Sequence, residues 1–136
     1  MYKNILVAID PSHGPDQEKA LHMATHLAEN TMSQITALTV VEPIPAAVLA
    51  ESSTDIAEQA GALALADLRN LVGTRSEVKT VIRHGKAGST IVDYASEHGI
   101  DCIVLASHKP GLSDYFLGST AARVVRHAPC SVHVMR

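Results

Sequence analysis

The chain has 136 residues, of which 46% are hydrophobic and 18% are charged, and its formal net charge is −3. This length and composition predict one globular domain over residues 1–136 and exclude a disordered chain. Only 3% of the residues are aromatic and there is no basic excess. Because the bases of single-stranded nucleic acid usually stack on aromatic rings and the phosphates of a duplex need a basic surface, we expect no nucleic-acid partner.

Strands and helices are predicted to alternate along the whole chain, because apolar runs alternate with segments of helical periodicity. A continuous aliphatic run such as residues 5–9 is typical of a strand buried on both faces of a parallel sheet. Strands are predicted at residues 5–9, 35–41, 78–83, 101–106 and 131–135, and helices at residues 16–30, 55–72, 89–98 and 119–127. Residues 46–54 receive no assignment.

The second predicted helix, residues 55–72, has an apolar stripe at helical spacing and a glycine, Gly73, at its end. The stripe consists of Ala57, Ala60, Ala64, Leu68 and Leu71. We expect this face to pack against the sheet.

The alternation of strands and helices predicts the fold class. Right-handed crossovers between parallel strands place helices on both faces of one sheet. We therefore predict a Rossmann-like three-layer α/β/α sandwich with five parallel strands in the order 3-2-1-4-5. The two most apolar strands, at residues 5–9 and 103–105, form its central pair. Ligands of such sheets bind at the carboxyl ends of the strands, so residues 10–15 and 107–118 are the expected site.

The cysteines and the lengths of the apolar runs indicate the compartment. Cys102 and Cys130 are far apart and lie in or beside apolar runs, which is the pattern of buried thiols rather than of a disulfide or zinc framework. Residues 5–9 are too short a run for a signal peptide, and no later run is long enough to span a membrane. We expect a cytoplasmic protein.

The segment at residues 107–119 reads Ser-His-Lys-Pro-Gly-Leu-Ser-Asp-Tyr-Phe-Leu-Gly-Ser and leads into a helix. A helix N-terminus attracts phosphate, Gly118 permits close approach of the backbone, and Ser119 and Thr120 can donate hydrogen bonds. The pair Gly118-Ser119 is also a common helix start, in which Ser119 serves only as the N-cap. The spacing alone leaves both interpretations open.

Other residues of the same two loops are candidates for the site. Asp10, at the end of the first strand, could bind a ribose hydroxyl or a metal that bridges phosphates, or it could cap the following turn. Lys109 and Gly111 lie on the approach to the phosphate position. His108 could contact a phosphate or bond the local backbone, and the sequence does not separate these two roles.

Four segments carry a resemblance to a known family: residues 3–10, 38–42, 101–108 and 117–132. In them the sequence resembles the universal stress protein family, in particular its single-domain, ATP-binding F/G-type members. The last of these segments is the most specific, and the resemblance extends over the whole chain. In ATP-binding members the loop has two spaced glycines before the final Gly-Ser or Gly-Thr pair. Here Ala106 and Lys109 stand at the two earlier glycine positions, and the loop is one residue shorter.

The resemblance implies an adenine-nucleotide site and a dimer. Asp10 would lie at the ribose and phosphates, where Mg²⁺ bound to ATP could also reach it, and the backbone around Val40 would bind the adenine edge. The full expected set is Ala8, Ile9, Asp10, Val40, Ala106, Ser107, His108, Lys109, Gly111, Gly118, Ser119 and Thr120. The final strand, with Val132 and Val134, would pair with a second copy to form a homodimer.

Two further patterns are weaker. His22 and His26 have the spacing of a metal pair but lie on a polar helix face without a third ligand, so we interpret them as solvated. Residues 85–89 resemble a phosphate-binding turn without the Gly-Lys-Ser/Thr ending, and we interpret them as a strand-to-helix turn with Ser89 as the helix cap.

No motif of nucleophilic or acid–base catalysis is evident. The resemblance, together with the convergence of Asp10 and residues 118–120, implies a stress-response regulator that binds ATP, and the absence of such motifs predicts at most slow hydrolysis. The alternatives are a nucleotide-free interaction module of the same fold, which the short loop with Ala106 and Lys109 favours, and a true ATPase or adenylyl-transfer enzyme.

Overall fold

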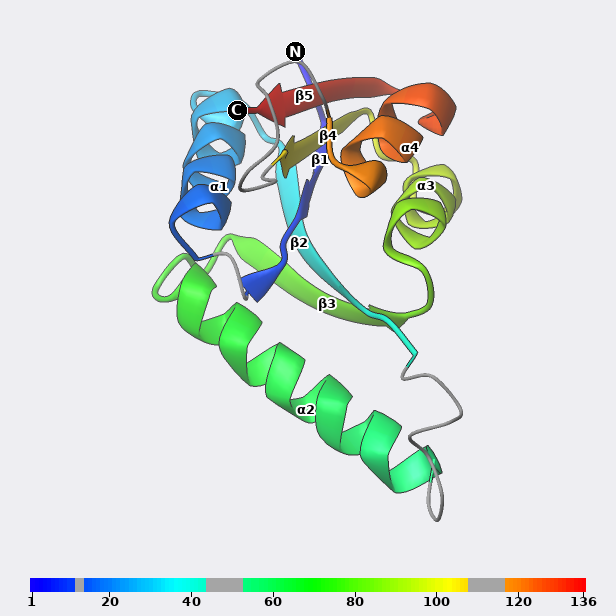
Figure 1. Ribbon diagram of the computed structural model, residues 1–136. Coiled ribbons are helices and arrows are strands. Elements are labelled where there is room, and N and C mark those ends of the chain that lie inside the picture. Colours follow the sequence, from blue (N-terminus) through cyan, green and yellow to red (C-terminus); the bar gives the residue numbers. More distant parts are fainter. Residues whose placement is uncertain (12–13, 44–52, 108–116) are drawn as a thin grey trace.

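Five parallel strands form one sheet in the order β3-β2-β1-β4-β5, and a helix connects each strand to the next in sequence (Figure 1). The computed structural model describes residues 1–11, 14–43, 53–107 and 117–136. The strands are β1 (Asn4–Ala8), β2 (Gln34–Val41), β3 (Val78–His84), β4 (Cys102–Ala106) and β5 (Ser131–Met135), and the helices are α1 (Gly14–Ala28), α2 (Ser53–Val72), α3 (Ala87–Glu97) and α4 (Ser119–His127). The predicted fold class and strand order are confirmed.

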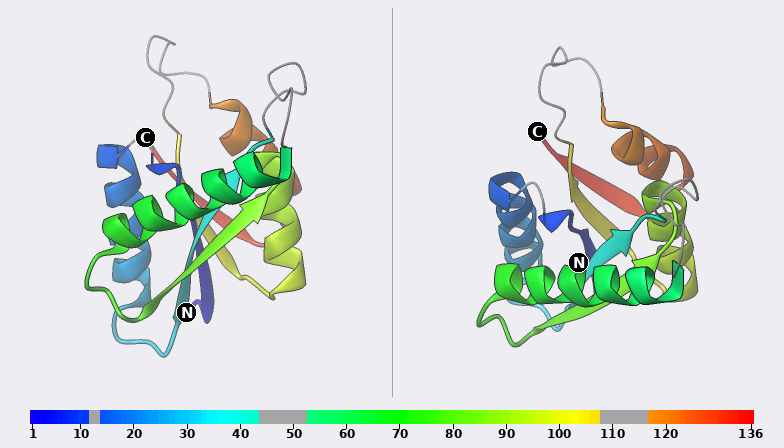
Figure 2. Two further views of the ribbon diagram at one scale, coloured as in Figure 1. Left: turned by 90° about the horizontal axis from the view of Figure 1, so that it is seen from below. Right: turned by 60° about the horizontal axis from the view of Figure 1, so that its bottom comes forward.

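Helices cover both faces of the sheet, and each face has its own apolar core. Ile5 and Val7 of β1 belong to a cluster that includes residues of α1 and α2, whereas Leu6 belongs to a cluster with residues of α3 and α4. Figure 2 shows α2 running alongside β3, on the face of the sheet that α2 covers. Because successive residues of a strand point to opposite faces, a strand covered on both sides needs an unbroken apolar run.

The third helix begins earlier than predicted. α3 starts at Ala87, its N-cap is Lys86, and the N-cap position makes no side-chain hydrogen bond. The expectation that Ser89 caps the helix is therefore wrong. The Ser89 hydroxyl instead donates to the Lys86 carbonyl within the first turn, at 3.4 Å, and the Ala87 N–H donates to Oε1 of Glu42 at 3.1 Å.

The apolar stripe of α2 is buried only toward the C-terminal end of the helix. Leu68 is fully buried, Ala60 and Ala64 are half-buried, and Ala57 is exposed. Ala57 and Leu68 are eleven residues apart, about three turns, and so they lie on the same face. The first turns of α2 are therefore less covered than its last turns.

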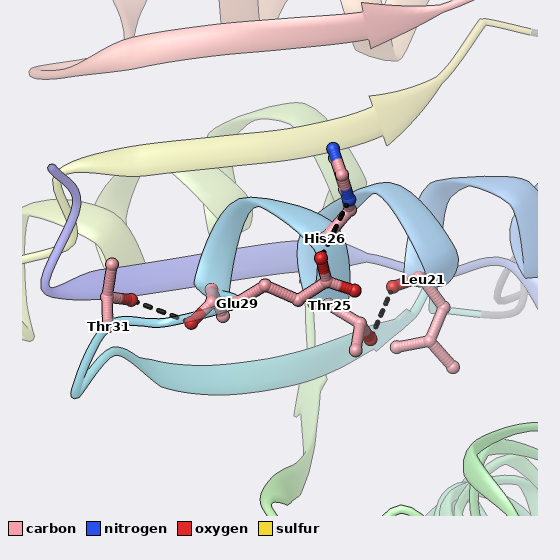
Figure 3. A network of polar contacts seen from close by, with 6 residues as sticks. Leu21, Thr25, His26, Glu29 and Thr31 are labelled. Carbon is pink, nitrogen blue, oxygen red and sulfur yellow. Dashed lines mark hydrogen bonds and ion pairs between the residues drawn. The ribbon is translucent and has the colours of Figure 1, made fainter.

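His22 and His26, the two histidines of α1, each contact a charged side chain on the surface. Nδ1 of His26 lies 3.1 Å from Oε2 of Glu29 (Figure 3), and Arg75 donates to Nε2 of His22 at 3.4 Å. No cluster of three or more His, Cys, Asp or Glu side chains that could hold a metal occurs in the described ranges. Nor is any helix there long and apolar enough to cross a membrane.

The thiol of Cys102 is expected to resist alkylation in the folded protein at pH 8. Burial, together with nearby Cys130 and Asp101, raises its pKa from 9.0 to about 11, and burial also raises the pKa of Cys130. Only the thiolate reacts, so modification should become fast on unfolding in urea. The preference for the protonated thiol favours the folded state up to about pH 9 and is lost as the pH rises toward 11.

Mass spectrometry after a brief treatment with iodoacetamide, with and without urea, measures this protection of Cys102. Complete modification of Cys102 in the native protein at pH 8 would contradict it.

Candidate functional site

A cavity of about 430 Å³ opens at the carboxyl ends of β1, β2 and β4, next to the first turns of α1, α3 and α4. Figure 2 shows β4 ending and α4 beginning at this edge of the sheet. Nine of the twelve predicted binding residues line the cavity together: Ala8, Ile9, Asp10, Val40, Ala106, Ser107, Gly118, Ser119 and Thr120. The other three, His108, Lys109 and Gly111, lie outside the described residues.

The first turn of α4 presents backbone donors to this cavity. The N-cap position of α4 is Gly118, and no side-chain hydrogen bond caps the helix there. The interpretation of Ser119 as the N-cap is therefore wrong. The Ala122 N–H donates to the Gly118 carbonyl at 2.9 Å, which leaves the N–H groups of residues 119–121 without an acceptor inside the helix. The Gly118 N–H donates to Oγ of Ser107 at 3.1 Å and so connects the ends of β4 and α4.

The backbone of Val40 faces the space beyond the end of β1. The Leu38 carbonyl accepts from the Ile9 N–H at 2.8 Å, and on the other side of β2 the Val41 carbonyl accepts from the Gly85 N–H at 3.0 Å. Backbone groups of successive strand residues alternate between the two neighbouring strands. Val40 therefore directs its N–H and carbonyl to the β1 side, where β1 has already ended.

Gln17 is a cavity residue that the sequence analysis did not single out. Its Oε1 accepts a hydrogen bond from the backbone N–H of Asp10 at 3.0 Å, and only 5% of the residue is exposed. A signal was present in the sequence, because Gln17 shares the buried stripe of α1 with Ala20, Leu21 and Ala24. A polar residue on an apolar stripe needs a specific partner.

Glu42 was also missed, and it places a carboxylate at the start of α3. Its Oε1 accepts the Ala87 N–H, and both residues line the cavity. α3 approaches α4 closely because Gly88 has no side chain, since a Cβ there would lie 2.9 Å from Cδ of Arg123. The two helix N-termini thus meet at one cavity, and Glu42 already satisfies a donor of α3.

The charged side chains among the described lining residues are both acidic, Asp10 and Glu42. The remainder of the wall is aliphatic or small, with Leu38, Ile91 and Leu105 among its members. An anion in this cavity would therefore depend on the backbone donors of α4 or on a cation that accompanies it.

The fold and the cavity define the class of protein: a doubly wound α/β domain with its candidate site where the strand order reverses. The universal stress protein family matches residues 1–136. The chain belongs to that family.

Individual relatives agree with this assignment. A putative universal stress protein of Staphylococcus aureus strain USA300 is 31% identical over 147 residues, which cover 99% of this chain and 84% of the relative. The structure of universal stress protein UspA from Lactobacillus plantarum is 32% identical and has a TM-score of 0.68, with 99% of this chain and 98% of that chain covered.

Two more distant structures are similar in fold. One is the universal stress protein from Archaeoglobus fulgidus in complex with dAMP, at 22% identity and a TM-score of 0.64, covering 99% of this chain and 98% of that chain. The other is a universal stress protein in complex with cAMP, at 18% identity and a TM-score of 0.66, covering 99% and 97%.

Proposed function

We propose that this universal stress protein is a regulator that binds ATP in the cavity at the ends of β1, β2 and β4. The observation that carries the proposal is the convergence of Asp10 with the open N–H groups of residues 119–121 on one cavity. A carboxylate for a ribose and a helix N-terminus for phosphate are complementary to a nucleotide. Two family members with adenine nucleotides bound support the same ligand class.

Each part of ATP has a matching group in the cavity. The phosphates would bind at the first turn of α4, with the hydroxyls of Ser119 and Thr120 as further donors. The backbone N–H and carbonyl of Val40 suit the adenine edge, whose ring nitrogen accepts and whose amino group donates. Asp10 would bind the ribose hydroxyls, or Mg²⁺ carried by the phosphates.

Calorimetry with ATP and Mg²⁺ tests the proposal. We expect heat of binding and an increase in the melting temperature at millimolar nucleotide. Mass spectrometry of freshly purified, denatured protein provides an independent measurement of any retained nucleotide. The absence of heat, stabilisation and retained nucleotide would favour a nucleotide-free interaction module instead.

Asp10→Ala is expected to weaken binding of ATP with Mg²⁺ by about tenfold to a hundredfold, because a hydrogen bond to a charged group contributes about 1.5–3 kcal/mol. Asp93→Ala on the exposed face of α3 removes the same charge away from the cavity and should change affinity less than about twofold. Calorimetric titration of both variants measures the difference. Equal affinities of Asp10→Ala and the wild type would remove Asp10 from the site.

We also propose a homodimer that forms through β5, at the edge of the sheet. Val132 and Val134 pair in register with Ile103 and Leu105 of β4, so their side chains point toward the α3 and α4 face. Both are half-buried, and Val132 packs against that core cluster. The outer backbone groups of β5 have no neighbouring strand among the described elements, and they are the groups that a second copy would pair with.

Val134→Lys is expected to convert this dimer to a monomer, because a charged side chain on a half-buried edge position opposes strand pairing. Val125→Lys introduces the same side chain at an exposed position of α4 and should leave the dimer intact. Light scattering gives the mass of each, and circular dichroism checks that both variants are folded. A Val134→Lys protein that remains a dimer would place the interface elsewhere.

A further inference from the structure

Gln17 has a fixed orientation that leaves its amide donors facing the cavity. The group that approaches it from Asp10 is a backbone N–H, 3.0 Å from Oε1. An N–H can only donate, so the oxygen of the carboxamide must lie on that side and the NH₂ group on the other. The direction of the Gln17 donors therefore follows from chemistry rather than from a choice between two equivalent rotations.

Among the described residues, the Gln17 side chain makes one hydrogen bond, in which its Oε1 accepts from the Asp10 N–H. Its NH₂ group therefore has no acceptor among those residues. The residue is nevertheless 95% buried, being 5% exposed. No fully enclosed side-chain nitrogen or oxygen in the described part of the chain lacks a partner, so Nε2 must be reachable from outside. Gln17 lines the cavity, which provides that access.

A buried donor without a protein acceptor is unfavourable unless a ligand or water accepts its hydrogen bond. Thr39, the other buried polar residue in the described ranges, is satisfied within the protein, because its hydroxyl donates to the Ile9 carbonyl at 2.9 Å. Gln17 differs from Thr39 in that its free donors open into the cavity.

We propose that Gln17 Nε2 donates to a ribose hydroxyl oxygen of the bound nucleotide and makes the site prefer ribonucleotides to deoxyribonucleotides. This inference rests on the proposed binding of ATP. A ribose hydroxyl both donates and accepts, and the adjacent Asp10 carboxylate can only accept when ionised. Gln17 supplies the complementary donor beside it. The phosphates are a poorer match, because Gln17 lies on α1 and the phosphate donors on α4, on opposite faces of the sheet.

The experiment compares the affinities of ATP, 2′-deoxy-ATP and 3′-deoxy-ATP, each with Mg²⁺, by calorimetry. Gln17→Glu keeps an oxygen for the Asp10 N–H and replaces the NH₂ donor by a second oxygen. Its added charge weakens all three nucleotides alike, so the ratio of affinities is the quantity to follow. Gln17→Met removes the donor without adding a charge. Gln34→Glu makes the same chemical change at an exposed position at the amino end of β2.

The wild type and Gln34→Glu should prefer ATP to at least one deoxynucleotide by about tenfold, the contribution of roughly one hydrogen bond. In Gln17→Glu and Gln17→Met this ratio should fall to within about twofold of unity. Melting curves establish that both variants are folded.

Two results would overturn the role of Gln17 alone: a wild type that binds all three nucleotides equally, or a preference that persists unchanged in both Gln17 variants. A wild type that binds none of the three would overturn the proposed function itself and this inference with it. The two failures are therefore distinguishable in a single set of titrations.

Discussion

Gly118→Asp is expected to lower the affinity for ATP at least about a hundredfold, equivalent to about 2.7 kcal/mol, without disrupting the fold. Gly118 has φ −59° and ψ 157°, a conformation open to any residue, and a Cβ there would lie 3.9 Å from Oγ of Ser107, an ordinary contact. An aspartate N-cap accepts the N–H groups at the start of its helix. These are the groups that we propose for the phosphates.

Two effects add in this variant. The carboxylate competes for the backbone donors of residues 119–121, and it repels the phosphate that would lie beside it. Two like charges about 4 Å apart near a protein surface repel by about 4 kcal/mol. The same carboxylate should stabilise α4 by only a few tenths of a kcal/mol, because glycine is already a tolerable N-cap, so affinity should fall while the melting temperature rises slightly.

Gly118→Asn separates charge from shape. Asparagine has almost the same size and is an equally good N-cap, so it competes for the donors without repelling a phosphate. We expect an affinity between those of the wild type and Gly118→Asp, measured by calorimetry with ATP and Mg²⁺. If Gly118→Asp binds ATP as tightly as the wild type, the phosphates do not lie at the first turn of α4.

The central pair of strands could be predicted because β1 and β4 have unbroken apolar runs, which are typical of strands covered on both faces. The helix starts were less accessible. Ser89 was a reasonable cap by local sequence, but α3 begins at Ala87, whose N–H bonds Glu42, 45 residues earlier in the chain. A contact of that kind depends on the folded sheet and has no local pattern in the sequence.

The candidate site also contains residues that the sequence could predict and contacts that it could not. Asp10 and Gly118 could be found because each follows or begins an element at the carboxyl edge of the sheet, where the topology alone places ligands. Gln17 could have been noticed as a polar residue on the buried stripe of α1. Its partner, the Asp10 N–H, becomes evident only when α1 is packed beside the end of β1.

Leu68→Ala is expected to destabilise the fold by about 3 kcal/mol, because removing a fully buried leucine side chain loses its burial and leaves a cavity. Leu68 is 0% exposed and belongs to the core cluster between α2 and the sheet. Leu63 is 67% exposed on the same helix. Leu63→Ala makes the same substitution with the same change in helix propensity, and it should alter stability by less than about 0.5 kcal/mol.

Urea denaturation of Leu68→Ala and Leu63→Ala measures the loss of stability. Calorimetry with ATP, at urea concentrations well below each midpoint, measures the affinity of the folded variants. No described residue of α2 lines the candidate cavity, so Leu68→Ala should retain the ATP affinity of the wild type while it is folded. Equal losses of stability in the two variants would contradict the packed face assigned to α2. A loss of affinity in folded Leu68→Ala would mean that α2 is coupled to the site, since Leu68 does not line the cavity.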